Sequence, residues 1–128
     1  MSAPMALELP PHVESASEAR AVALEWASGR EEGAVFALEL VVSELVTNAV
    51  RHGAGPITLT LADEAGGIRV GVHDLGPRGP EARYPDLRST GGRGLGVVDQ
   101  LSWDWGVERS RAGRGKTVWA IVKAPVSR

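Results

Sequence analysis

The sequence predicts one α+β domain built as a two-layer α/β sandwich, in which three helices cover one face of an antiparallel or mixed sheet. Hydrophobic spacing is helical in the first part of the chain and changes to a period of two from Ile57 onward. The expected element order is helix, helix, strand, strand, loop, helix, strand, strand, without an internal repeat. At 128 residues, the chain 1–128 is long enough for a single hydrophobic core.

The N-terminal segment 1–14 is expected to be an arm or an edge strand. Its apolar run ends at two consecutive prolines, which do not suit a central strand. A first helix should follow over about residues 18–28, with Ser15 or Ser17 as its N-cap and Gly29 at its end. Both serines have the hydroxyl that an N-cap requires, and the sequence leaves the choice open.

A longer helix should begin near residue 31 or 34 and end at Gly53. Its apolar residues recur at i, i+3, i+4 and i+7, which turns one stripe toward the core. Glu44 and Asn48 are one turn apart beside this stripe, where they would line a rim. A carboxylate and a carboxamide there can serve as a base and as a neutral ligand for a hard cation, although an ordinary exposed helix surface has the same pattern.

Two strands are predicted after this helix, and the second one carries a polar residue on its apolar face. Alternating residues from Ile57 to Leu61 predict the first strand, and 68–74 the second. Asp74 has the same parity as the buried positions before it, so its side chain should point inward. An ionised carboxylate on a core face needs a donor. Alternatively, Asp74 lies just past the strand and caps the following turn.

A long connection then leads to a run of glycines. Residues 77–90 contain three prolines and no hydrophobic period, as expected of a binding lid or a disordered segment. The glycines at 91–96 directly precede an apolar-patterned helix. Glycines there let backbone N–H groups approach an anion, and a helix N-terminus carries a partial positive charge. Taken alone, such a run is also typical of a flexible turn.

The C-terminal part predicts two more strands. Residues 103–107 alternate, and 117–122 are apolar on both faces, which indicates a central strand. Thr117 could donate its hydroxyl to a ligand or simply be a β-branched strand former. The four tryptophans are better explained by core or interface packing than by stacking on nucleic-acid bases, because no cationic groove accompanies them.

Composition argues against several functions. A net charge of −2 without a basic run disfavours binding to nucleic acid or to an anionic membrane. The absence of cysteine excludes disulfides and thiol chemistry, and three scattered histidines do not form a metal cluster. The N-terminus lacks the pattern of a signal peptide or a membrane span, so a cytoplasmic location is expected.

Four short motifs, in this order, resemble the asparagine box and glycine boxes of the Bergerat-fold (GHKL) ATPases. They are ELVTNA with Glu44 and Asn48, DLG with Asp74 and Gly76, GRGLG over 92–96, and GKT ending at Thr117. The resemblance extends from about residue 22 to 122. In its length and in the sequences of its motifs, the chain is most similar to the small bacterial anti-sigma-factor serine/threonine kinases of partner-switching systems. It departs from the family at Arg78, where the first glycine box would end in glycine.

The resemblance implies a site for ATP and Mg²⁺, with an ATP lid at 77–91. Asp74 would accept a hydrogen bond from the adenine amine, Gly76 would let the base approach, and Thr117 would be a second polar contact. Asn48 would coordinate magnesium, and Glu44 would orient and deprotonate the attacking hydroxyl. The phosphates would be wrapped by Gly92, Arg93, Gly94, Leu95 and Gly96.

The implied function is that of a protein kinase that phosphorylates a serine of an antagonist (anti-anti-sigma) protein and sequesters a sigma factor. One alternative is a non-catalytic regulator of the same fold that acts through protein contacts. Another is a stand-alone ATPase. The resemblance also leaves a homodimer open, with the tryptophan-bearing strands as a candidate surface.

Overall fold

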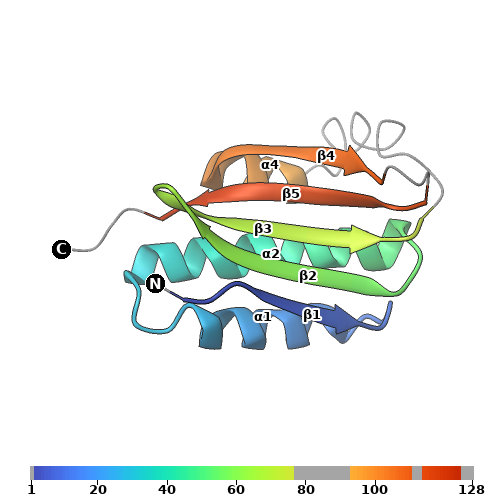
Figure 1. The fold of residues 1–128 in the computed structure, drawn as a ribbon, viewed down its shortest axis with the longest axis horizontal. Coiled ribbons are helices and arrows are strands. Elements are labelled where there is room, and N and C mark those ends of the chain that lie inside the picture. The colour runs from blue at the N-terminus through green and yellow to red at the C-terminus, as the bar shows by residue number, and fades with distance from the viewer. Residues whose placement is uncertain (1, 77–92, 111–113, 125–128) are drawn as a thin grey trace.

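The structure is a computed structural model that describes residues 2–76, 93–110 and 114–124. Five strands form one sheet, and the three helices of the described residues lie on one side of it, behind the strands in Figure 1. The elements in chain order are β1 (Met5–Leu9), α1 (Ser15–Trp26), α2 (Glu32–His52), β2 (Ile57–Glu64), β3 (Gly67–Asp74), α4 (Arg93–Leu101), β4 (Ser102–Arg109) and β5 (Lys116–Lys123). The predicted two-layer α+β sandwich is confirmed.

The sheet has the strand order β1-β2-β3-β5-β4. Each neighbouring pair runs antiparallel, so the sheet is the antiparallel one of the two alternatives and not a mixed sheet. β1 lies at one edge of the sheet, which corresponds to the edge-strand alternative for the N-terminal segment. β5 lies between β3 and β4, which confirms the interior position that its apolar residues indicate.

The helices begin at slightly different residues from those expected. α1 begins at Ser15, and no side chain caps it; the Ser15 hydroxyl instead donates to the carbonyl of Pro10. α2 begins after Glu31, whose carboxylate accepts the backbone N–H of Ala34 at 3.0 Å. α4 begins inside the glycine run, so its first residues include glycines that the sequence placed ahead of the helix.

The hydrophobic core lies between the sheet and the helices. α2 supplies its central side chains, and eight of the helix's residues are buried. By length and composition α2 could cross a membrane, but burial against the sheet accounts for the same apolar character. The core also contains buried residues of α1, α4 and β5, and the inward-facing residues of β2 and β3: Ile57, Leu59, Leu61, Ile68, Val70 and Val72.

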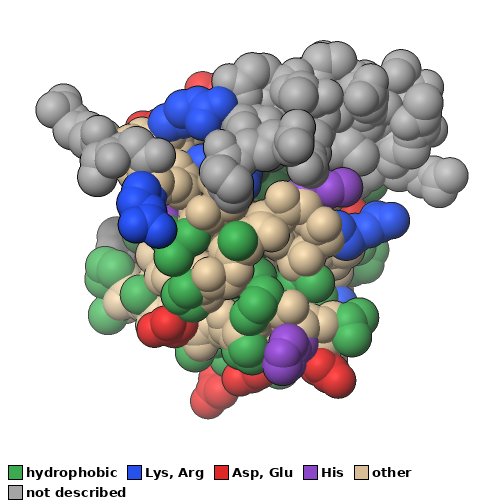
Figure 2. Space-filling model, turned by 90° about the vertical axis from the view of Figure 1, so that its right-hand side faces the viewer, with side chains coloured by type: hydrophobic (Ala, Val, Ile, Leu, Met, Phe, Trp, Pro, Cys, Tyr) green, Lys and Arg blue, Asp and Glu red, His purple; other side chains and the backbone are tan. Residues whose placement is uncertain are grey.

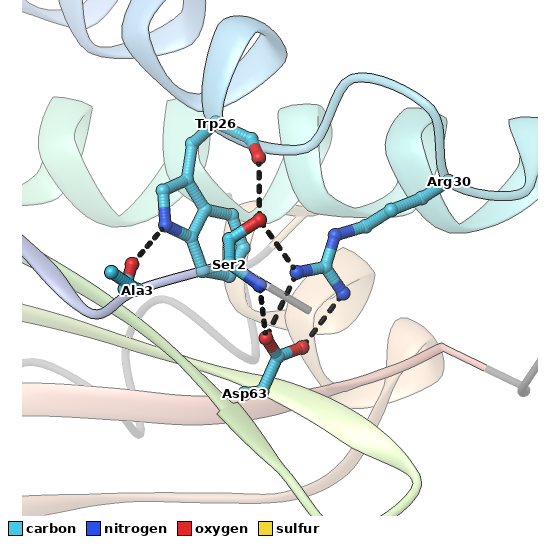
Figure 3. A network of polar contacts seen from close by, with 5 residues as sticks. All are labelled: Ser2, Ala3, Trp26, Arg30 and Asp63. Atoms are coloured by element: carbon cyan, nitrogen blue, oxygen red, sulfur yellow. Dashed lines mark hydrogen bonds and ion pairs between the residues drawn. The ribbon is translucent and has the colours of Figure 1, made fainter.

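A polar network joins the end of α1, the α1–α2 connection and β2 (Figure 3). The guanidinium of Arg30 donates to both carboxylate oxygens of Asp63, at 2.7 and 3.0 Å, and lies 4.5 Å from the ring centroid of Trp26. Ser2 donates from its backbone to Asp63 and from its hydroxyl to the carbonyl of Trp26, while the Trp26 indole donates to Ala3. The hydrogen bond from Arg30 lowers the pKa of Asp63.

Three segments far apart in the sequence meet at one end of the molecule. The end of α2, the end of β3 and the start of β5 all lie toward the right of Figure 1. Figure 2 views the molecule from that side, where hydrophobic side chains and tan atoms (backbone and uncharged polar side chains) lie among several charged and histidine side chains. This end contains most of the described residues that the motifs single out.

Candidate functional site

Asp74 is the last residue of β3, and only 1% of its surface is exposed. The predicted inward orientation is confirmed. The carboxylate also accepts the backbone N–H of Gly76 at 2.7 Å, so it caps the following turn as well. The inward orientation and the turn cap therefore occur together, although Asp74 lies within the strand and not just past it. The turn bond fixes the direction of one carboxylate oxygen, Oδ1.

The donor that the buried carboxylate requires comes from the chain itself. Lys116, the first residue of β5, is the cross-strand partner of Asp74. Its Nζ lies 2.8 Å from Oδ1 and 2.9 Å from Oδ2, and the residue is 6% exposed. Because removing one partner of a buried ion pair leaves the other charge uncompensated, loss of either side chain should cost roughly 3–5 kcal/mol of stability.

Two glycines allow the chain to pack directly against the Asp74 carboxylate. A Cβ at Gly53 would lie 2.5 Å from Asp74 Cγ, and one at Gly76 would lie 2.8 Å from Oδ1. Real Cβ atoms do not approach this closely. The close approach at Gly53 brings the end of α2 against the end of β3, so the two elements that carry the predicted site residues meet at this carboxylate.

Glu44 and Asn48 lie on α2, within its last three turns before Gly53. Both are partly buried. Asn48 Nδ2 is inaccessible to solvent and has no hydrogen-bond partner in the described part of the chain. A half-turn of the side chain exchanges the oxygen and nitrogen ends of a carboxamide, so its oxygen can take either of the two positions. Asn48 therefore fits the role of a neutral oxygen ligand for Mg²⁺.

The structure places the side chain of Thr117 on the other face of the sheet from Asp74. Thr117 pairs with His73 across β3 and β5, one position from the pairing of Asp74 with Lys116. Successive strand residues point to opposite faces, so Thr117 lies on the sheet face away from the helices. Its methyl group would be 3.5 Å from a Cβ placed at Gly71 on that face. The second polar group beside Asp74 is Lys116, which the motifs did not single out.

The glycine run is described from Arg93 onward, where α4 begins. The first four residues of a helix, here 93–96, have backbone N–H groups without an intrahelical acceptor. A Cβ at Gly96 would meet no described atom within 4 Å. α4 packs beside α2, so these amides belong to the same helix layer as Asn48. Gly92, the lid at 77–91 and the side chains of Arg93 and Leu95 lie outside what the structure describes.

Together these features define a class of site. A buried carboxylate at a strand end is approached by glycine backbone, and a carboxamide lies on the adjacent helix. A second helix begins within the glycine run, where the first backbone N–H groups have no intrahelical acceptor. Such a combination suits a nucleotide, with a polar contact for the base, a ligand for the metal and N–H groups for phosphate. The sheet has five antiparallel strands with helices on one face. A site of this kind on such a sheet defines an ATP-binding α/β-sandwich domain.

The sequence profile of the histidine kinase-like ATPase domain family matches residues 9–122. The chain belongs to this family, and it is an ATP-binding domain of the histidine kinase-like type. The matched segment runs from the end of β1 to the end of β5, and so includes the site residues of α2, β3 and α4. A search of curated proteins finds no match to the chain.

Proposed function

We propose that this domain is a serine/threonine protein kinase of the anti-sigma-factor type, which uses Mg²⁺ and ATP to phosphorylate a serine of an antagonist protein. The observation that carries the proposal is the position of Glu44. Its side chain is partly buried on α2, one turn before Asn48, and it makes no hydrogen bond or ion pair with any residue that the structure describes. A carboxylate with no described partner, one turn from a candidate metal ligand, is suited to accept a proton.

In this proposal each element has one part of the reaction. Asp74 and Gly76 bind the adenine, and the N-terminal amides of α4 bind phosphate oxygens. Asn48 holds Mg²⁺, which, when bound, neutralises charge on the phosphates. Glu44 orients the serine hydroxyl of the acceptor and takes its proton. The serine oxygen forms a bond to the γ-phosphorus, the bond from that phosphorus to the bridging oxygen breaks, and ADP leaves.

The partner and the cellular setting are part of the same proposal. The short motifs support an antagonist protein as phosphate acceptor and a sigma factor as the sequestered partner, both in the cytoplasm. The recognition surface has no motif of its own. Partner identity is therefore best tested with candidate antagonist proteins rather than by substitutions in this chain.

A second candidate function is a non-catalytic regulator that acts by protein contacts. One observation favours it: Lys116 already supplies the charge partner of Asp74, so the buried carboxylate does not depend on an adenine for compensation. Retention of Glu44 argues for the kinase, because a purely binding module has no use for a base at that position.

Incubation with γ-labelled ATP, Mg²⁺ and candidate antagonist proteins distinguishes the two functions. The kinase predicts label on a serine of one acceptor. Glu44→Gln, which keeps the size of the side chain and removes the base, should lower transfer by roughly 10²–10⁴-fold and leave ATP affinity nearly unchanged. Glu39→Gln, on the same helix and also partly buried, is the matched control and should transfer normally.

Three other outcomes have separate meanings. ATP binding without transfer to any acceptor would favour the regulator. Steady phosphate release in the absence of a protein acceptor would indicate a stand-alone ATPase. Equal transfer by Glu44→Gln and the unaltered protein would contradict the role of Glu44 as the base.

A further inference from the structure

The buried Asp74–Lys116 pair has unused hydrogen-bonding capacity on both of its members. An ionised carboxylate offers about four lone-pair sites, two on each oxygen. Oδ1 accepts from the backbone of Gly76 and from Lys116, and Oδ2 accepts from Lys116. Among the described residues, this leaves one free acceptor direction on Oδ2.

The ammonium of Lys116 is similarly incomplete. It has three N–H donors, and two of them are directed at the carboxylate oxygens of Asp74. No described residue accepts the third. A donor this deeply buried would lose solvation if it stayed unpaired, so a ligand with an acceptor at this position would gain a charge-assisted hydrogen bond.

We propose that Lys116 is a specificity-determining residue that contacts the nucleotide base together with Asp74. The inference rests on the ATP site proposed above and adds a residue to it. Oδ2 of Asp74 accepts from the 6-amino group of adenine, and Nζ of Lys116 donates to the neighbouring ring nitrogen N1. An acceptor and a donor side by side thus match the donor and acceptor that adenine presents along one edge.

The same pair disfavours guanine in that orientation. Guanine has a carbonyl oxygen at position 6 and an N–H at position 1, which is the reverse order of acceptor and donor. Its oxygen would face the carboxylate of Asp74, and its N–H would face the ammonium of Lys116. The two side chains are held on neighbouring strands. They therefore distinguish adenine from guanine by the order of hydrogen-bond donor and acceptor as well as by shape.

The other end of β5 provides a matched lysine for comparison. Lys123 is exposed, its Nζ donates to the carbonyl of Gln100 at 3.2 Å, and it lies 5.5 Å from the ring centroid of Trp103. It is separated from Asp74 by the length of the strand. Replacing Lys123 removes a lysine from the same strand without changing the Asp74 pair.

The test compares affinities for ATP, 1-deaza-ATP and 7-deaza-ATP by titration calorimetry. The 1-deaza compound replaces N1 with C–H, and the 7-deaza compound makes the same replacement at a ring position that the proposal does not use. The unaltered protein should bind 1-deaza-ATP about ten- to a hundredfold more weakly than ATP, since a hydrogen bond from a charged donor is lost. The 7-deaza compound should stay within about threefold of ATP.

Lys116→Met should bind ATP and 1-deaza-ATP with equal affinity, whereas Lys123→Met should discriminate between them as the unaltered protein does. If Lys116→Met proves too unstable to titrate, the analogue comparison on the unaltered protein decides. Equal affinity for ATP and 1-deaza-ATP there would overturn the proposal.

The proposal would also be overturned if Lys116→Met bound ATP more tightly than the unaltered protein, because the lysine would then compete with the base. The proposal would likewise be overturned if Lys116→Met discriminated between ATP and 1-deaza-ATP as strongly as the unaltered protein does. In both cases ATP still binds, and the proposed function stands. Failure of the unaltered protein to bind any of the three nucleotides would instead remove the ATP site, and this inference with it.

Discussion

The side chain of Asp74 is held by its neighbours in one position, with one oxygen bonded to both Gly76 and Lys116. Asp74→Asn keeps the size of the side chain but introduces an amide N–H₂ group and leaves the Lys116 ammonium without its counter-charge. We expect this variant to lose discrimination of adenine over guanine nucleotides and to bind ATP at least tenfold more weakly. Competition binding with ATP and GTP measures both effects.

Asp104→Asn, an exposed change on β4, is the control for this experiment and should keep the selectivity of the unaltered protein. Asp74→Asn should also lower the melting temperature, because a buried lysine is left unpaired. Unchanged selectivity in a folded Asp74→Asn protein would show that the carboxylate does not contact the base.

The sequence predicts the burial of Asp74 but not its partner. Parity within one strand follows from the positions of the neighbouring apolar residues. The partner depends on the register between β3 and β5, which are separated by α4 and β4 in the chain. A shift of one residue exchanges the two faces of a strand. That single position separates Thr117, which the motifs indicate, from Lys116, which the structure places at the carboxylate.

At the scale of elements, the start of α4 combines a helix with glycines that a stable helix does not favour. The sequence places these glycines ahead of the helix, whereas α4 includes two of them in its first four residues. Periodicity cannot locate this boundary, because glycine has no side chain to contribute to the pattern. The expected function of the segment, to expose backbone amides, is compatible with either boundary.

Gly96→Ala should affect the stability of α4 and its affinity for ATP in different directions. A methyl group at position 96 would meet no described atom within 4 Å, and alanine favours a helix over glycine by about 0.5–1 kcal/mol. We expect the melting temperature to stay the same or rise, while ATP affinity falls, since the methyl group occupies space beside the helix N-terminus. Thermal melting and calorimetry on one preparation test both. Undiminished ATP affinity would argue against phosphate at this turn.

The network around Arg30 and Asp63 gives a pH dependence at the junction of α1, α2 and β2. The folded-state pKa of Asp63 is lowered, chiefly by the hydrogen bond from Arg30. A lowered carboxyl pKa contributes stability above the unfolded value, near 3.9, and the contribution is lost as the pH falls below that value. Asp63→Asn should therefore be less stable at pH 7 by about 1 kcal/mol, a modest value because the pair is partly exposed.

Denaturant unfolding at pH 7 and at pH 3 checks this prediction. The difference between Asp63→Asn and the unaltered protein should shrink at the lower pH, where the carboxyl is protonated in part. A difference that is the same at both pH values would mean that the ion pair with Arg30 does not contribute, and that the variant acts through packing alone.

At the scale of the molecule, most of the architecture follows from the sequence. The change from a period of 3.6 to a period of two identifies the helices and the strands. The interior position of β5 follows from its apolar character on both faces, and the edge position of β1 from the prolines that end it. The sequence does not determine whether pairing is antiparallel throughout the sheet, because strand direction depends on how chain segments cross rather than on their composition.

The whole domain should respond to nucleotide as one cooperative unit, because the site lies where α2, β3 and β5 meet. A ligand that binds the folded state alone stabilises it by about 2.7 kcal/mol at a concentration one hundred times its dissociation constant. Titration calorimetry with ATP and Mg²⁺, followed by thermal melting of the same sample, is the most direct test. We predict a measurable heat of binding and a higher melting temperature, both reduced when EDTA removes the metal. No heat and no change in melting temperature at millimolar ATP and Mg²⁺ would contradict the account.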